Sequence, residues 1–388
     1  MTLKHAAAIT GVAEMRPRKS AEGLSTLGIW AEVSRGAMLD AGIDPADIDG
    51  LLVAPPITDM VAMWPSHLGE YLDIHPRYAN VVDLGGASAA GMVWRAASAI
   101  QSGLCRAVLC VSGEASDVDT FYAPRARRPS RQLPMREFEA PYGPMGVNSG
   151  YAQIAMRHMH EFGTTGRQLA KVAVDQRTNA AANPDALYRD PIAVDDVLAS
   201  PLIVDPLHLY EIVRPCTGGA AFIVVSPDLA VSSTQTPVWL LGAGEATRGV
   251  MLAQVPSVTT SPIAISAPTA FGMAGAKPSD VDLISVYDCY TITVVVTLED
   301  AGFCAKGRGG AFVEEHDLTF SGDCPVNTHG GQLSFGQPGL AGGMSHVTEA
   351  VRQLQRRAGD RQVRDCEMAF VNGNGGIMSE QASLVLAV

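Results

Sequence analysis

The sequence lacks the patterns that would place it in several common classes. It has no apolar run near the roughly 20 residues of a membrane helix, and residues 1–13 lack the long apolar block of a signal peptide. Its seven cysteines are odd in number and irregularly spaced, so they indicate neither a disulfide framework nor a zinc motif. Acidic residues outnumber basic ones, 40 to 28, which disfavours a nucleic-acid surface because phosphate attracts positive charge. We therefore expect a cytoplasmic protein that binds no membrane, nucleic acid or metal.

What is present is the composition of a compact globular protein. Of the 388 residues, 47% are apolar and only 18% are charged. A disordered chain would have far fewer apolar residues and more charge. The length is sufficient for two ordinary domains or for one duplicated fold with a large core.

Three features of the chain occur twice, in the same order. They are a helix end with the turn and strand after it, a glycine-rich turn before a helix, and a strand that ends at a glycine. The pairs are Ala41–Asp49 with Ala274–Asp282, Gly85–Ser88 with Gly342–Ser345, and Ala107–Gly113 with Met368–Gly373. Such a long repeat period predicts two like domains and not a solenoid.

Helical and strand patterns alternate within each half, which predicts an α/β fold with a mixed sheet. We expect domains at 1–235, including an inserted loop region of about 115–200, and at 236–388. The predicted helices cover 25–40, 87–102, 150–162, 167–182, 265–273, 292–301 and 344–357. The predicted strands cover 5–12, 51–54, 80–83, 107–111, 222–226, 239–242, 283–286, 368–371 and 382–388. Residues 322–339 are predicted to form a loop.

The stretch 285–291 is the strongest candidate for chemistry. The apolar strand Leu283–Val286 ends in Tyr287-Asp288-Cys289-Tyr290, which opens a helix. Rigid backbone on both sides would fix these side chains, as at many α/β active sites. The alternative is a capped helix with two tyrosines at the surface.

The inserted region contains an arginine-rich stretch, 125–136, with Tyr122 and Tyr142 nearby. Guanidinium groups could hold the phosphates of a nucleotide-like ligand. The alternatives are a solvated loop and a subunit contact.

Several motifs together resemble those of the thiolase superfamily, in the branch of sterol carrier protein and lipid-transfer-protein thiolases. They are the Tyr-Asp-Cys-Tyr strand end, the glycine-rich segment Val326–Gly331 and the closing segment Val371–Gly376. The resemblance implies a thiolase fold of two duplicated βαβαβαββ-type halves and coenzyme A as part of an acyl-CoA substrate, with no further cofactor. It also implies a homodimer, with an OB-fold, zinc-ribbon protein as a candidate partner.

The chain departs from the condensing thiolases at the positions that carry their chemistry. Gly86 stands where the resemblance implies the acylated cysteine, and Asn372 where it implies the second cysteine. The Gly-His-Pro motif reads Gly336-Gln337-Pro338, and an amide cannot take up a proton at neutral pH. All three groups needed for Claisen condensation are therefore replaced.

A tyrosine at position 287, where sterol carrier thiolases carry histidine, is also typical of the thiolase-like aldolases. Retro-aldol cleavage needs proton transfer and a stabilised enolate, but no acyl-cysteine. We therefore expect Tyr287, Asp288 and His329 to be catalytic, and His346 to serve packing. The alternative for His329 is that it only bonds backbone carbonyls. The predicted substrate contacts are Gly86, Ser88, Asn327, Gly330, Gly331, Gln337, Asn372 and Gly373. Those aldolases have a second tyrosine where this chain has Phe335.

Two other functions stay open at this point. The first is an acyltransferase that works with a partner and uses Cys289 or Cys110 as a displaced nucleophile. The second is a catalytically silent subunit that shapes or activates another protein. A displaced nucleophile would have to be an accessible thiolate, and a thiol inside an apolar strand is inert.

Overall fold

The computed structural model describes residues 2–59, 61–116, 135–143 and 146–388. Most of the arginine-rich stretch 125–136 lies outside these residues, so its phosphate-binding role stays a prediction. None of the described helices is long and apolar enough to cross a membrane.

The described strands form one large mixed sheet in the order β3-β2-β4-β7-β1-β8-β11-β10-β9. The first half contains β1 (Ala8–Glu14), β2 (Gly50–Val53), β3 (Tyr78–Val81), β4 (Ala107–Glu114) and β7 (Gly218–Val225). The second half contains β8 (Val238–Thr247), β9 (Leu283–Val286), β10 (Met368–Gly375) and β11 (Glu380–Ala387). A short separate hairpin pairs β5 (Leu202–Val204) with β6 (Leu207–His208).

The two halves of the sheet have the same connectivity. β2 pairs with β4 in parallel, and β9 pairs with β10 in parallel. In the first half, β7 pairs antiparallel with β4 and with β1. In the second half, β11 pairs antiparallel with β10 and with β8 in the same way. The preceding helices α1 (Thr26–Ala41) and α9 (Ile263–Ala274) both end at a left-handed glycine, Gly42 and Gly275, with the same φ of 70°. The repeated sequence features are therefore repeated structure, and the predicted α/β architecture with a mixed sheet is confirmed, while the boundary at residue 235 stays a prediction.

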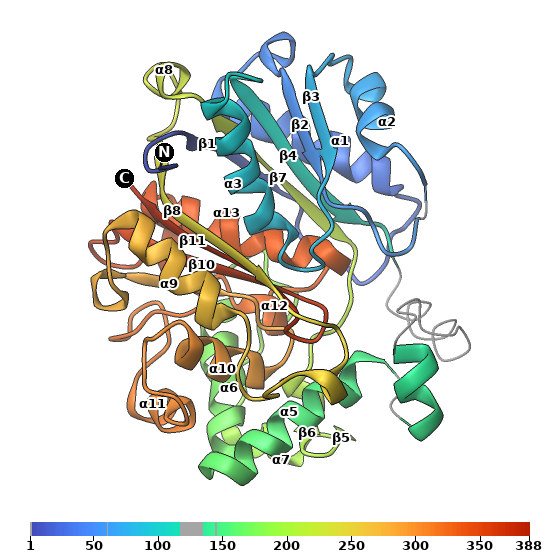
Figure 1. Ribbon diagram of the computed structural model, residues 1–388, viewed down its shortest axis with the longest axis vertical. Helices are drawn as coiled ribbons and strands as arrows, with labels where there is room; N and C mark the ends of the chain where they lie inside the picture. Colours follow the sequence, from blue (N-terminus) through green and yellow to red (C-terminus); the bar gives the residue numbers. More distant parts are fainter. Residues whose placement is uncertain (1, 60, 117–134, 144–145) are drawn as a thin grey trace.

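Helices fill the space between the two halves of the sheet and cover both outer faces (Figure 1). One cluster of buried residues surrounds α3 (Ser88–Gln101) and α13 (Gly342–Leu354), which contact each other between the halves. A second cluster includes α9 and α10 (Thr291–Asp300), and a third includes α1 and α2 (Trp64–Leu72). The result is a layered order of helix, sheet, helix, sheet, helix.

The inserted region contributes three helices to one end of the molecule (Figure 1). They are α5 (Val147–Phe162), α6 (Gly166–Ala181) and α7 (Val194–Ala199), and the first two pack against α10. Short turns of helix at 135–139 and 140–142 precede them. This places the inserted helices on the same side of the sheet as the helix that follows Tyr287.

The observed elements agree with the predicted ones except at the hairpin β5–β6 and at five short helices, α2, α7, α8 (Pro227–Ala230), α11 (Gly309–Glu315) and α12 (Gly331–Ser334). α11 begins with two glycines, which disfavour helix, but Glu299 accepts a hydrogen bond from the Gly309 N–H at 2.7 Å. α12 occupies four residues of the predicted loop 322–339 and also begins at a glycine. Tertiary contacts stabilise these two helices, which local propensity does not.

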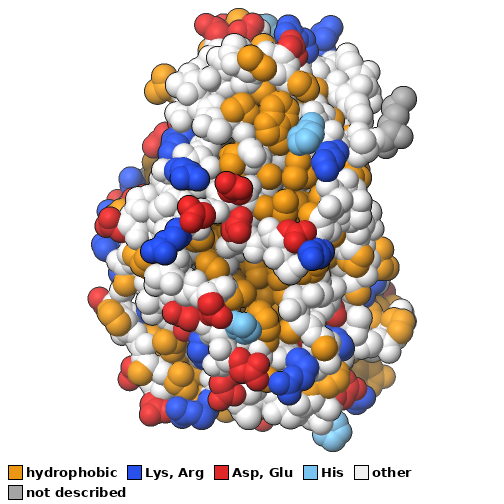
Figure 2. Space-filling model, turned by 90° about the vertical axis from the view of Figure 1, so that its left-hand side faces the viewer, with side chains coloured by type: hydrophobic (Ala, Val, Ile, Leu, Met, Phe, Trp, Pro, Cys, Tyr) orange, Lys and Arg blue, Asp and Glu red, His pale blue; other side chains and the backbone are white. Residues whose placement is uncertain are grey.

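Figure 2 shows one face of the molecule, with a band of apolar side chains along its middle. Acidic and basic side chains lie on both sides of the band. On this face the charges are mixed and do not form the basic stripe typical of nucleic-acid binding.

Candidate functional site

The carboxyl end of β9 brings together three segments that sequence analysis selected. β9 pairs with β10 as far as Val286 and Asn372, and the Tyr287 N–H donates to the Asn372 carbonyl at 2.9 Å. On the other edge of β9, the Asn327 N–H donates to the Ile284 carbonyl at 2.9 Å. Strand pairing therefore gathers the predicted site at one edge of the sheet.

Tyr287 lies at the centre of this site and contacts Gln337. Its side chain is 5% exposed, and its hydroxyl oxygen accepts a hydrogen bond from Gln337 Nε2 at 2.8 Å. Burial, with smaller effects from Cys289 and Asp288, raises the Tyr287 pKa well above 10, although the Gln337 bond opposes this. At neutral pH the phenol is therefore protonated and can donate a hydrogen bond. Two residues fifty positions apart in the sequence, both predicted to face substrate, are in direct contact.

Gly86 leaves room for the Tyr287 ring. A Cβ atom added at Gly86 would overlap Cε2 and Cζ of that ring, far inside van der Waals contact. The carbonyl oxygen of Asn374 would also be too close. A side chain at position 86 and a tyrosine at position 287 therefore exclude each other in this arrangement. The phenol occupies the space that a cysteine side chain at position 86 would need.

Asp288 holds the start of α12 and approaches His346. Its carboxylate accepts hydrogen bonds from the Gln332 N–H at 2.8 Å and the Leu333 N–H at 3.2 Å. His346 Nε2 lies 3.3 Å from Asp288 Oδ1, and His346 Nδ1 lies 3.2 Å from Ser285 Oγ. These contacts of Asp288 lie within the protein and orient neighbouring groups, and its catalytic role stays a prediction.

His346 has a more polar environment than sequence analysis expected. It is buried, but its ring lies 6.0 Å from the Tyr287 ring and 5.1 Å from the His329 ring, between centroids. It therefore links the two residues that we predicted to move protons. Its place in the first turn of α13, just after the repeated glycine pair, is the sequence signal that could have identified it.

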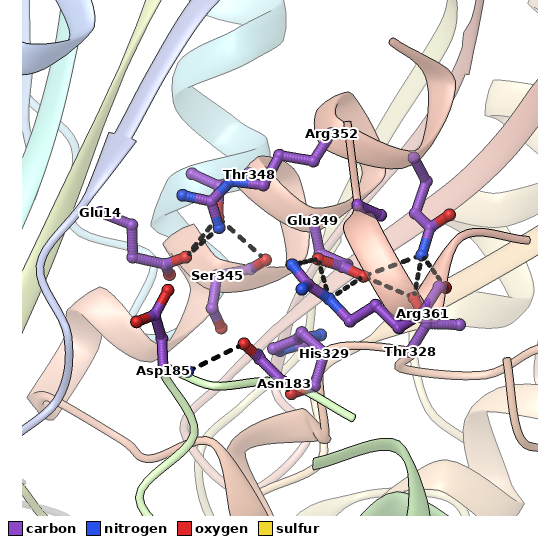
Figure 3. A network of polar contacts seen from close by, with 12 residues as sticks. Glu14, Asn183, Asp185, Thr328, His329, Ser345, Thr348, Glu349, Arg352 and Arg361 are labelled. Carbon is purple, nitrogen blue, oxygen red and sulfur yellow. Dashed lines mark hydrogen bonds and ion pairs between the residues drawn. The ribbon is translucent and has the colours of Figure 1, made fainter. Parts of the chain in front are cut away.

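His329 is buried without a partner for either ring nitrogen among the described residues. Its backbone carbonyl accepts from Asn183 Nδ2 at 2.9 Å, and its ring lies beside the buried Glu349–Arg361 pair (Figure 3). Burial, and then the neighbouring His346, lower the His329 pKa well below 6.5, although Glu349 opposes this. The imidazole is therefore neutral at pH 7, and it bonds no backbone carbonyl in the part of the chain that the structure describes.

The buried Glu349–Arg361 pair lies beside His329 (Figure 3). Arg361 Nη2 donates to Glu349 Oε2 at 2.9 Å, and Thr328 Oγ1 donates to Glu349 Oε1 at 2.7 Å. Burial would raise the Glu349 pKa, but the Arg361 guanidinium outweighs burial and lowers it to about 2. Glu349 is therefore a fixed negative charge near the neutral imidazole.

The two asparagines that we predicted to contact substrate, Asn327 and Asn372, make hydrogen bonds to other residues of the sheet. Asn327 Oδ1 accepts from the Val286 N–H at 2.8 Å, and Asn327 Nδ2 donates to the Val286 carbonyl at 2.9 Å. Asn372 Nδ2 donates to Gln381 Oε1 at 3.0 Å, and its Oδ1 accepts from Ser383 at 2.7 Å. These side chains hold the strand ends in place, and their contact with substrate stays a prediction.

The predicted glycine and serine contacts also serve close packing. Ser88 closes its own turn, because its hydroxyl accepts from the Leu84 N–H at 2.9 Å and donates to the Gly85 carbonyl at 2.6 Å. Added Cβ atoms at Gly330, Gly331 and Gly373 would collide with Ala180, Asp288 and Ala87, respectively. These residues let backbone segments approach one another around Tyr287.

The thiols near the site are protected by burial. Burial is the main cause that raises the Cys289 pKa to about 12, and it raises the Cys110 pKa well above 9. Neither is a thiolate at neutral pH, so neither has the form of cysteine that attacks a thioester. Among the described residues, no cluster of three His, Cys, Asp or Glu side chains could hold a metal ion.

An open cavity of about 900 Å³ lies near this region but does not contain it. Its lining includes Lys277, Phe303, Phe320 and Arg364, and none of the predicted site residues. The candidate site is therefore a closely packed group of side chains at which Gln337 is partly exposed.

Comparisons with known proteins show which family the chain is similar to. The model of the thiolase C-terminal domain-like family matches residues 244–388. An acetyl-CoA acetyltransferase of Methanothermobacter thermautotrophicus is 33% identical over 350 residues, 89% of this chain and 90% of that protein. A steroid side-chain-cleaving aldolase of Thermomonospora curvata is 31% identical over 389 residues, 97% of this chain and 96% of that protein.

Solved structures extend the likeness to the whole fold. A structure described as the Ltp2-ChsH2(DUF35) aldolase matches with a TM-score of 0.88 and 29% identity, covering 100% of this chain and 98% of that one. The chain belongs to the thiolase superfamily, in the branch that holds the sterol-carrier-protein thiolases and the thiolase-like aldolases.

Proposed function

We propose that this protein is a thiolase-like aldolase that splits a β-hydroxyacyl-CoA by retro-aldol cleavage without an acyl-cysteine. The observation that carries the proposal is the Tyr287 phenol, which is held by Gln337 and fills the space left open at Gly86. The relatives named as a steroid side-chain-cleaving aldolase and a 17-hydroxy-3-oxo-4-pregnene-20-carboxyl-CoA lyase support this reaction class. They also favour a substrate of the lipid or sterol side-chain type.

The reaction breaks the bond between the α and β carbons of the acyl group. The β-hydroxyl gives up its proton and becomes the carbonyl of a ketone or aldehyde, while the bonding electrons pass to the thioester enolate. Protonation of the α carbon then yields a shorter acyl-CoA. The neutral His329 accepts the hydroxyl proton, and the Tyr287 phenol donates a hydrogen bond to the thioester oxygen as charge develops there.

Two further residues keep this pair in position. His346 packs between the rings of Tyr287 and His329, so it limits how each can turn. Asp288 fixes both His346 and the start of α12, which follows His329 directly in the chain. Positioning of this kind contributes to rate because the reacting groups need no reorganisation.

We also propose a cytoplasmic assembly of more than one chain. The edge strand β3 ends the sheet, and three of its four residues are exposed, which suits pairing with a second copy in a homodimer. The description of the Ltp2-ChsH2(DUF35) aldolase names a second protein, which supports a partner subunit and is consistent with an OB-fold, zinc-ribbon protein. Coenzyme A takes part only as the carrier of the acyl group.

The decisive test supplies β-hydroxyacyl-CoA thioesters and measures the ketone or aldehyde released. We expect Tyr287→Phe to reduce this release at least ~100-fold, because the phenol hydrogen bond stabilises the enolate. Cys289→Ser is the matched control at the same strand end and should retain release. Unchanged release in Tyr287→Phe, with an intact circular dichroism spectrum and melting temperature, would remove Tyr287 from the mechanism.

An acyltransferase is the second candidate, favoured by the 33% identity to an acetyl-CoA acetyltransferase. It predicts an acyl adduct on Cys289 by mass spectrometry after incubation with acyl-CoA, whereas the buried thiol predicts none. The silent-subunit alternative predicts release only after a catalytic partner is added, and the same release with Tyr287→Phe.

A further inference from the structure

Three cationic side chains from separate parts of the chain gather around the ring of Tyr188. Arg214 Cζ lies 3.6 Å from the ring centroid, Lys19 Nζ 5.7 Å and Arg177 Cζ 5.9 Å. Arg177 also lies 5.6 Å from the ring centroid of Tyr210. We call Lys19, Arg177, Tyr188 and Arg214 the cation cluster.

In the part of the chain that the structure describes, no carboxylate is paired with a cation of the cluster. Within residues 2–59, 61–116, 135–143 and 146–388, none of the three cations forms an ion pair. Arg177 donates to Ser334 Oγ at 2.9 Å and to the Asp190 backbone carbonyl at 3.0 Å, and both acceptors are neutral. Burial, and then the charge of Arg214, lower the Arg177 pKa, although the charge of Asp190 partly opposes this lowering. Like charges are therefore held together in a protein whose net charge is -12.

The cluster is open to solvent on one side. Arg177 is only 6% exposed, but Tyr188 and Arg214 are half-buried and Lys19 is exposed. The buried Arg177 therefore lies beside the half-buried Arg214 and the exposed Lys19. This arrangement suits an anion that enters from solvent and loses part of its hydration.

The cluster adjoins the candidate site through the backbone. Arg214 stands between two backbone contacts: the Val213 N–H donates to the Cys289 carbonyl at 3.1 Å, and the Cys216 N–H donates to the Gln337 carbonyl at 3.1 Å. Gln337 in turn holds the Tyr287 hydroxyl. The Tyr188 N–H donates to the Ser334 carbonyl at 3.0 Å, at the end of α12. The cations therefore flank the segment that carries Gln337.

We propose that Lys19, Arg177 and Arg214 bind a carboxylate carried on the acyl part of the thioester substrate. Guanidinium groups bind carboxylates through paired hydrogen bonds, and the Tyr188 ring beneath Arg214 keeps that guanidinium in a fixed plane. The cluster flanks the segment of Gln337, which contacts the Tyr287 hydroxyl, whereas the phosphates of coenzyme A are separated from the thioester by the pantetheine arm. This inference rests on the proposed CoA-thioester substrate and specifies its class.

The test compares binding of acyl-CoA pairs that have the same chain length and differ only in a terminal carboxylate. The probes are glutaryl-, adipoyl- and suberyl-CoA against pentanoyl-, hexanoyl- and octanoyl-CoA, titrated calorimetrically into the full-length protein. We expect the best carboxylated probe to bind about tenfold more tightly than its uncharged counterpart. Arg214→Gln and Lys19→Gln should each reduce that ratio towards one and leave the uncharged thioester unaffected.

Arg189→Gln is the matched control. It removes a charge one residue from Tyr188, but the Arg189 guanidinium donates to the Ala181 carbonyl at 3.1 Å and contacts no member of the cluster that the structure records. The ratio should be unchanged in this variant. Circular dichroism and melting temperature establish that each variant is folded.

Three results separate the possibilities. Equal affinity for both members of every pair in the wild type would overturn the carboxylate site, while the proposed function would stand. Equal weakening of both members by Arg214→Gln, abolished with dephospho-CoA thioesters, would assign the cluster to the 3′-phosphate and would also overturn the inference. No binding of any probe, the uncharged thioesters included, would instead contradict the proposed function.

Discussion

At the residue scale, this site is distinguished by the close contact between Gly86 and the Tyr287 ring, which fills the space that a side chain at position 86 would need. Sequence analysis identified both positions, because each departs from a thiolase motif. Nothing in the sequence indicates that the Tyr287 phenol fills the volume that a side chain at position 86 would occupy. The contacts of His346 were hidden for a related reason: a histidine in an apolar helix pattern gives no sign of the ring and the carboxylate that lie beside it in the fold.

Because of this close contact, we expect Gly86→Ala to reduce activity strongly, although it adds only one methyl group. The new Cβ would push the Tyr287 ring from its position, and such overpacking costs roughly 1–3 kcal/mol. We expect the free energy of unfolding to fall by that amount and kcat for carbonyl release to fall at least ~10-fold, measured by urea unfolding and steady-state kinetics.

Gly272→Ala is the control for this prediction. Gly272 lies in α9, and an added Cβ meets nothing within 4 Å. Alanine in a helix interior is favoured over glycine, so this variant should gain roughly 0.5–1 kcal/mol of stability and keep its activity. If Gly86→Ala behaved like Gly272→Ala, the close contact with Tyr287 would be refuted.

At the element scale, the positions of the main helices and strands followed from periodicity and from glycine and proline signals. The last residues of the repeated helices were predictable because Gly42 and Gly275 adopt the left-handed conformation that ends a helix. The short helix α12 was not predictable, because its first turn depends on the Asp288 carboxylate, 43 residues before Gly331 in the chain. The partners of Asn327 and Asn372 were equally hidden, because both amides bond to strands that pair only in the folded sheet.

The buried ion pair between Glu349 in α13 and Arg361 in the turn 359–361 links these two elements. It makes a pH-dependent contribution to stability. The Glu349 pKa is lowered from 4.5 to about 2, which corresponds to about 3 kcal/mol. Because the folded pKa is the lower one, this contribution is complete above pH 4.5 and is lost as the pH falls towards 2. Glu349→Gln would also leave Arg361 buried without its partner, so we expect a loss of about 3–5 kcal/mol at pH 7.

Urea unfolding of wild type and Glu349→Gln between pH 7 and pH 3 checks this prediction. The difference between the two proteins should be constant above pH 4.5 and should shrink below it. Glu315→Gln is the control, because the Glu315–Arg308 pair is exposed and should contribute less than about 1 kcal/mol. A constant difference down to pH 3 would contradict the assignment of the pH dependence to Glu349.

At the scale of the whole molecule, the duplicated architecture was the part most accessible from sequence. Three repeated features in one order predicted two like halves, and the sheet shows them with the same connectivity. The cation cluster was not accessible in this way. Its three cations come from the segment after β1, from α6 and from the segment before β7, and Tyr188 lies between α6 and α7, so only the packed fold brings them together beside Gln337.

The central claim is that this thiolase fold cleaves its substrate without a covalent acyl-enzyme. One measurement tests it most directly: mass spectrometry of the products and of the intact protein during turnover of a β-hydroxyacyl-CoA in deuterium oxide. We expect a free ketone or aldehyde, an acyl-CoA with one deuterium on its α carbon, and a protein that carries no acyl adduct. An acyl group on any cysteine of the turning-over protein would contradict it.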